Sequence, residues 1–155
     1  MRAASLTILL AAVIFASPAE ASFWNVFGRA MEDVAARDGN IIIDISTLSK
    51  MSSRHYRYQE GGQVIKFFVV RDGQGVVRAA LDACRVCWKA GRGYTLADGA
   101  MTCRQCGQIF PLNRIGLATG GCDPLSFRFK TENDALIIST QELLRGMNYF
   151  PENNK

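Results

Sequence analysis

Short apolar runs separated by polar, glycine-rich turns dominate the chain, and this pattern predicts β-strands. The strongest run covers residues 64–70, and shorter ones cover residues 41–45, 56–59 and 76–81. β-Branched and aromatic residues favour such strands. The segment at residues 71–75 carries two glycines and predicts a tight loop between its neighbours. We therefore expect antiparallel hairpins formed by consecutive strands.

The second half of the chain continues the pattern with shorter elements. Residues 94–96 and 100–102 are short enough for a small hairpin, and residues 126–130 and 135–139 predict a last one. Residues 141–147 predict a short closing helix. No repeat or low-complexity linker divides the chain, so we predict a single domain over residues 41–150, followed by a tail at residues 151–155.

Apolar positions at helical spacing mark the segment before the first strand. They predict an amphipathic helix over residues 23–34, with a linker that ends near residue 40. Two interpretations stay open for residues 22–40. The helix docks on its own domain, or its aromatic start contacts a membrane surface or a membrane partner.

The first 21 residues have the features of a secretory signal peptide. Arg2 supplies positive charge, residues 6–15 are apolar except for Thr7, and Ala19-Glu20-Ala21 forms a small-x-small cleavage site. The mature protein is expected to begin near Ser22, and an uncleaved anchor is the alternative. Because twin arginines are missing, we predict unfolded export by the general secretory route to the periplasm.

Charge changes this picture little. The 155 residues carry a formal net charge of +4, and removal of residues 1–21 takes away one arginine and one glutamate, which leaves +4. An exported protein meets no genomic DNA, so we expect no nucleic-acid partner and interpret the charge as solubility.

Five cysteines carry the candidate chemistry. Two C-x-x-C pairs are separated by 15 residues, and a fifth cysteine follows after another 15: Cys84, Cys87, Cys103, Cys106 and Cys122. Each pair places two sulfurs on one side of a tight turn, and two facing turns make a four-sulfur pocket that suits zinc or iron. The predicted fold class is therefore α+β: antiparallel hairpins and short flanking helices around a loop-rich metal lobe at residues 82–124.

Four further residues are expected to support the site. Gly107 permits the positive φ that turns backbone N–H groups toward sulfur, and Gly121 allows the backbone to bring Cys122 close. Trp88 and Tyr94 shield the metal or fill the core of the lobe. A free or mispaired thiol is the alternative for Cys122, and disulfides without metal are the alternative for the two pairs.

Several chemistries are disfavoured by the residues present. Neither pair is followed by histidine, so the c-type haem motif is missing, and glycine-rich hairpins rather than a βαβ unit flank the pairs. His55 is the single histidine and is expected at the surface. No Ser/His/Asp grouping supports hydrolysis, so an electron carrier or accessory protein is favoured over an enzyme.

Beyond the pairs, a longer series of residues carries a family resemblance. It comprises Phe67–Asp72, Gly75–Cys84, Cys87, Gly93–Tyr94, Cys103, Cys106–Gly107, Phe110, Ile115–Gly116 and Gly120–Pro124. In their order and spacing these residues resemble the bacterial family described as membrane iron–sulfur containing, FtrD-like. The resemblance covers roughly residues 41–150.

The resemblance implies an extracytoplasmic metal-binding or redox accessory domain whose five cysteines hold an iron–sulfur cluster or a metal ion. It implies partners among inner-membrane iron-transport systems that pair a permease with copper-containing periplasmic proteins. Longer members carry a multi-span membrane region before this domain, so we expect a soluble or peripheral version here. Unfolded export argues against a preassembled cluster, because a cofactor must then be acquired outside the cytoplasm.

Three functions remain in competition. The first is electron transfer or metal handling, which a fifth sulfur favours; the second is a protein-binding module held by structural zinc; the third is a thiol–disulfide oxidoreductase. Four arginines make the cysteine segment basic and are interpreted either as a solvated face or as a dock for an acidic partner: Arg85, Arg92, Arg104 and Arg114.

Overall fold

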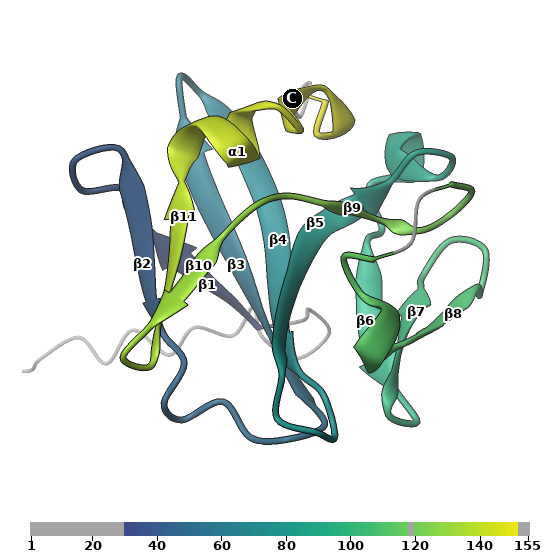
Figure 1. The fold of residues 1–155 in the computed structure, drawn as a ribbon. Helices are drawn as coiled ribbons and strands as arrows, with labels where there is room; N and C mark the ends of the chain where they lie inside the picture. Colours follow the sequence, from purple (N-terminus) through teal and green to yellow (C-terminus); the bar gives the residue numbers. More distant parts are fainter. Residues whose placement is uncertain (1–29, 118–119, 152–155) are drawn as a thin grey trace, which may run out of the picture.

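The computed structural model describes residues 30–117 and 120–151. Strands account for most of the regular structure there (Figure 1). They are β1 (Met31–Val34), β2 (Asn40–Asp44), β3 (Ser52–Glu60), β4 (Gln63–Arg71), β5 (Val77–Cys84), β6 (Tyr94–Ala97), β7 (Ala100–Cys103), β8 (Ile109–Pro111), β9 (Pro124–Ser126), β10 (Lys130–Glu132) and β11 (Ala135–Ser139). One short α-helix, α1 (Thr140–Leu144), and 3₁₀ turns at Trp88–Ala90, Leu112–Arg114 and Met147–Tyr149 complete the described part.

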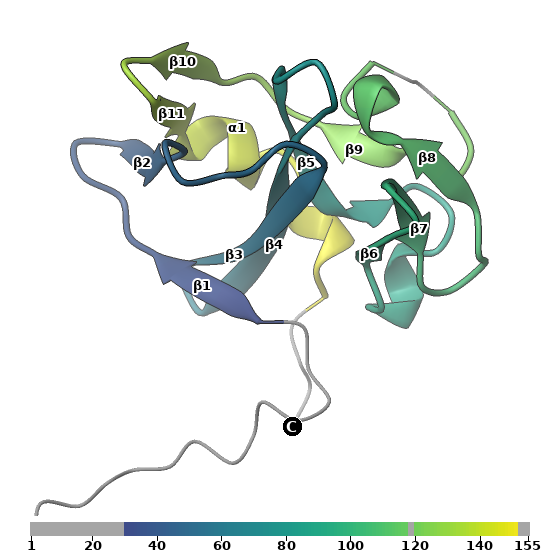
Figure 2. The same cartoon turned by 90° about the horizontal axis from the view of Figure 1, so that it is seen from below.

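Three sheets make up the molecule. The central sheet has the strand order β1-β3-β4-β5-β9, and two smaller sheets have the orders β10-β11-β2 and β6-β7-β8. Only the β1–β3 pair is parallel among the described strands. The two small sheets lie on opposite sides of the central one (Figures 1 and 2).

Strand β4 is apolar almost throughout because both of its faces are covered. Ile65, Phe67 and Val69 belong to one core cluster. Phe68 and Val70 point the opposite way and belong to a second cluster. Side chains alternate between the faces of a strand, so a run buried on both sides contains no polar alternation. This explains why the strongest predicted strand lies at the centre of the molecule.

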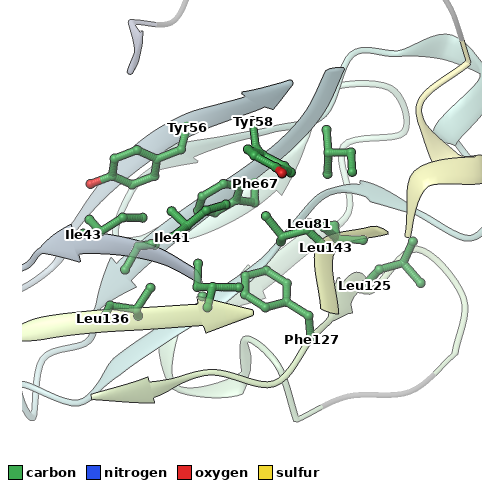
Figure 3. Packing of buried hydrophobic residues seen from close by; sticks show 14 of the residues in the cluster. Ile41, Ile43, Tyr56, Tyr58, Phe67, Leu81, Leu125, Phe127, Leu136 and Leu143 are labelled. Carbon is green, nitrogen blue, oxygen red and sulfur yellow. The ribbon is translucent and has the colours of Figure 1, made fainter. Parts of the chain in front are cut away.

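The larger core fills the space between the central sheet and the β10-β11-β2 sheet. Ile41 and Leu136 reach it from the small sheet, and Leu143 closes it from α1 (Figure 3). Phe67 is fully buried there and packs edge-on against Phe127, with ring centroids 5.9 Å apart. This layer makes the central sheet a rigid support for whatever packs on its other face.

The smaller core joins the central sheet to the β6-β7-β8 sheet. Phe68 and Val70 meet Tyr94 in this cluster, and two of the cysteines, Cys84 and Cys103, are buried members of it. Cys84 ends β5 and Cys103 ends β7. The metal lobe is therefore attached to the central sheet through its own candidate ligands.

The α+β class is confirmed in part, since hairpins carry the fold and the described helices are few and short. The helix predicted over residues 23–34 is wrong at its end, because Met31–Val34 form edge strand β1 beside β3. Only the two ends of that strand are partly buried, and this spacing of three imitates a helix. Residues 23–29 and the predicted signal peptide at residues 1–21 lie outside the described residues.

Three smaller expectations also need adjustment. The last hairpin pairs β10 with β11, so its first strand is Lys130–Glu132 rather than residues 126–130. The closing helix is shorter than predicted, and Gly146 separates α1 from a 3₁₀ turn. His55 is buried, with 5% of its surface exposed, and its ring contacts Phe68. The surface position predicted for it is therefore wrong.

Candidate metal centre

The five cysteine sulfurs converge on one site beside the central sheet. Cys84, Cys87 and Cys122 have Sγ atoms that all lie within 4.8 Å of one another, and so do those of Cys87, Cys103 and Cys106. Cys87 belongs to both groups, so its sulfur lies within 4.8 Å of the other four. We call this arrangement the thiolate site.

Cys122 joins the two pairs rather than standing apart from them. Its sulfur lies 3.5 Å from that of Cys87 and 3.4 Å from that of Cys106. Sequence spacing alone left this residue open as a free or mispaired thiol. The structure brings it within reach of one sulfur from each C-x-x-C turn.

Backbone N–H groups act on the first sulfur of both C-x-x-C turns. In the first turn the Cys87 N–H donates to Cys84 Sγ at 2.9 Å. In the second, burial raises the pKa of Cys103, and the backbone N–H groups of Cys106 and Gln105 oppose that rise. Backbone donors aimed at sulfur stabilise thiolate ligands, so both turns are prepared for a bound cation.

Gly107 has the positive φ predicted for it. Its φ of +76° is a conformation that side chains disfavour, and its N–H donates to the Cys103 carbonyl at 2.9 Å. The next amide, that of Gln108, lowers the pKa of the Cys106 thiol. The contribution of Gln108 is made by its backbone, and residue type carried no signal for it.

Tyr94 positions the loop that carries Cys122. The side chain is 1% exposed and packs between Phe68 and Phe110. Its hydroxyl donates to the Cys122 carbonyl. Tyr94 therefore fills the core of the lobe, which is one of the two roles predicted for it, and it also ties the fifth cysteine to the sheet.

Gly121 supplies a φ of +63°, and a Cβ there would meet nothing within 4 Å. Backbone conformation rather than close approach therefore explains this glycine.

A buried carboxylate braces the lobe. Asp82 lies two residues before Cys84 in β5, is 5% exposed, and accepts the Tyr94 N–H at 2.7 Å. A Cβ on Gly93 would stand 2.4 Å from both Asp82 carboxylate oxygens, so only glycine leaves room for this contact. Sequence reasoning missed the role, although a lone acid within an apolar strand is a usable signal because buried charges need partners.

The thiols differ in acidity because their surroundings differ. The Gln108 N–H, assisted by the Cys122 thiol, lowers the pKa of exposed Cys106 to about 7. The hydrogen bond with Cys122 and burial raise the pKa of Cys87. Burial raises the pKa of Cys122 to about 11. Without a metal, neutral pH therefore leaves the thiolate charge chiefly on Cys106.

A cavity of about 380 Å³ gives access to the inner side of the site. Cys84, Cys87 and Cys103 line it, together with Trp88 and Tyr149, whose rings meet edge-on at 5.9 Å. Trp88 packs against the larger core rather than the core of the lobe. We call this space the thiolate cavity.

The sulfur geometry fits a metal held by thiolates. Zinc–thiolate bonds of about 2.3 Å place the sulfurs of a tetrahedral site about 3.8 Å apart. Each group brings three sulfurs to separations that one ion allows, and the two groups meet at Cys87, which suits one ion per group or a small cluster in which each metal takes its own cysteines. In a four-iron cluster each iron takes its own cysteine, and the sulfurs stand farther apart. A bound iron or copper would supply one-electron chemistry, and zinc would supply structure alone.

The comparisons with known proteins agree with this site. The family described as "Membrane iron-sulfur containing protein FtrD-like" matches residues 48–150, which include all five cysteines. Neither a curated protein nor a solved structure matches the chain. Within the described residues we find no helix with the length and apolar character to cross a membrane. The chain belongs to the FtrD-like family of membrane iron–sulfur containing proteins.

Proposed function

We propose that this chain is an exported thiolate metal protein that passes electrons or metal ions to a membrane metal-transport system. The observation that carries the proposal is the position of Cys122. A structural site needs four sulfurs, whereas here a fifth lies 3.4 Å and 3.5 Å from two of the others. An additional ligand within reach allows one sulfur to replace another as a metal arrives or leaves.

The graded exposure of the sulfurs supports the same role. Cys84 and Cys103 are buried, Cys87 and Cys122 are intermediate, and Cys106 is exposed. Metal held at the exposed end would lie close to a docked partner, which shortens an electron path and opens a route for ligand exchange. The buried end would keep the site anchored to the central sheet while this happens.

A zinc-stabilised binding module is the second candidate. Three sulfurs in each group lie close enough together for one ion, and the lobe has only the smaller of the two described cores to hold it together. In that case Cys122 has no function and the metal is redox-silent.

Measurements on protein purified from the periplasm of its native host distinguish these functions. Metal analysis and a potentiometric titration followed by absorbance should show iron or copper, thiolate-to-metal absorption bands and reversible reduction. A colourless protein with one zinc per chain would support the binding module. Metal-free protein with oxidised cysteine pairs would contradict both and leave thiol–disulfide exchange. Failure to find the protein in the periplasmic fraction would contradict the predicted export.

A further inference from the structure

Lys66 occupies an unusual position on the central sheet. It lies on β4 with the same alternation as Phe68 and Val70, so it shares the face that carries the metal lobe. Its cross-strand neighbour Arg57 forms an ion pair with Asp33 at 2.7 Å. Lys66 makes no ion pair with any residue in the described ranges. A half-buried cation therefore stands at the edge of the lobe, in a cavity that Asp82 also lines.

Two arginines join Lys66 in one cleft. We call a hollow of about 430 Å³ in this part of the molecule the basic cleft. It is lined by Lys66, Arg92, Arg104, Gly91 and Met31. Its cations come from β4, from the loop after the first C-x-x-C turn, and from inside the second turn. No acidic residue lines it, and neither arginine forms an ion pair within the described part of the chain. Lys66 is half-buried and both arginines are exposed, so the concavity presents three positive charges to an anion that enters from solvent.

The basic cleft is continuous with the thiolate cavity. Lys66 and Gly91 line both spaces. A Cβ on Gly91 would meet nothing within 4 Å, so this glycine leaves the junction open. Volumes of about 380 Å³ and 430 Å³ suit a small organic ligand. The second turn is also held in place, because the Arg104 N–H donates to the Gly93 carbonyl at 2.9 Å.

We propose that the basic cleft binds a small polyanion with two or more carboxylate or phosphate groups, beside the thiolate site. Guanidinium groups bind such oxyanions through paired hydrogen bonds, and Lys66 would add a point charge at the inner end. The concave convergence of cations from three segments favours a small molecule over the acidic face of a protein. The inference deepens the proposed function and rests on it in one respect: the polyanion is the carrier portion of a metal chelate that delivers its metal next to the cysteines.

Calorimetry on the metal-loaded mature protein tests the site at low ionic strength. The probes are tricarballylate, a weakly chelating tricarboxylate, and inorganic pyrophosphate, which together separate carboxylate from phosphate recognition. We expect binding of at least one probe. Lys66→Gln, Arg92→Gln and Arg104→Gln should each weaken it about fivefold or more, and added salt should weaken it further. Lys130→Gln on β10, outside the lining of the cleft, removes the same charge and should leave binding unchanged.

Metal content of each variant keeps this proposal distinct from the proposed function. Unchanged metal with weakened anion binding supports the polyanion site. If the variants lose metal and neither probe binds the protein, the polyanion site is overturned. The cations would then balance the negative charge of the thiolate site. Binding of a deca-glutamate peptide but of neither small probe would also overturn it, as would equal effects of Lys130→Gln and Arg92→Gln. Charge-dependent anion binding in a wild-type protein that holds no metal would contradict the proposed function and leave the cleft as a polyanion site.

Discussion

Gly93→Ala tests whether the buried contact between Asp82 and Tyr94 holds the metal lobe on the central sheet. Gly93 has a φ of +62°, and its missing Cβ would lie 2.4 Å from both Asp82 carboxylate oxygens. Asp82 cannot simply move aside, because it is 5% exposed and bonded to the Tyr94 N–H at 2.7 Å. The alanine must therefore displace the carboxylate and break that hydrogen bond.

Gly91 provides a matched control for the size of the effect. Its φ of +63° is nearly the same, but a Cβ there meets nothing within 4 Å. Left-handed backbone costs a non-glycine residue about 1–2 kcal/mol, which both alanine variants share. Loss of a hydrogen bond to a charged group adds about 1.5–3 kcal/mol for Gly93→Ala alone. We expect Gly93→Ala to lower the free energy of unfolding by about 2.5–5 kcal/mol and Gly91→Ala by about 1–2 kcal/mol.

Urea unfolding of both metal-loaded variants, at one fixed free-metal concentration, measures this difference. Hydrogen exchange at the Tyr94 amide supplies a local readout, and its protection should fall only in Gly93→Ala. Equal losses in the two variants, or an undisturbed Tyr94 amide in Gly93→Ala, would refute the role assigned to the buried carboxylate.

Three further predictions concern the cysteines. Cys87→Ser should lower metal affinity at least about tenfold more than Cys122→Ser, measured by competition with a chromophoric chelator, because Cys87 neighbours all four other sulfurs; equal losses would contradict this. In reduced protein from which metal has just been removed, before the lobe opens, Cys106 should be alkylated first, at a rate that rises between about pH 6 and pH 8 as its thiolate forms. Peptide mapping that finds Cys122 modified first would refute that assignment. Chelation under reducing conditions should expose residues 84–122 to protease before the rest, and persistent resistance there would show that the lobe stands without metal.

The hairpins and both C-x-x-C turns could be predicted from the sequence because their causes are local. Apolar runs and glycine turns specify β3 to β5 and the pair β6–β7, and the spacing of two cysteines already places their sulfurs on one side of a turn. Gly107 belongs to the same class, since a C-x-x-C-Gly turn needs the positive φ that the structure has. In each case the neighbours in sequence are also the neighbours in space.

The remaining features depend on contacts between distant segments, which no local pattern encodes. Met31–Val34 becomes a strand because β3 offers a free edge, although its spacing also suits a helix. Cys122 reaches the site because Tyr94, 28 residues away in sequence, holds its carbonyl. The shared position of Cys87 between two sulfur groups arises only once both turns pack against the central sheet.

The sulfur coordination of the native metal tests the central claim most directly. X-ray absorption at the edge of the metal found in natively purified protein counts the sulfur neighbours and measures their distances. We predict a metal surrounded by about four sulfurs near 2.3 Å. Oxygen or nitrogen ligands in place of sulfur, or metal-free protein with the cysteines paired as disulfides, would contradict it.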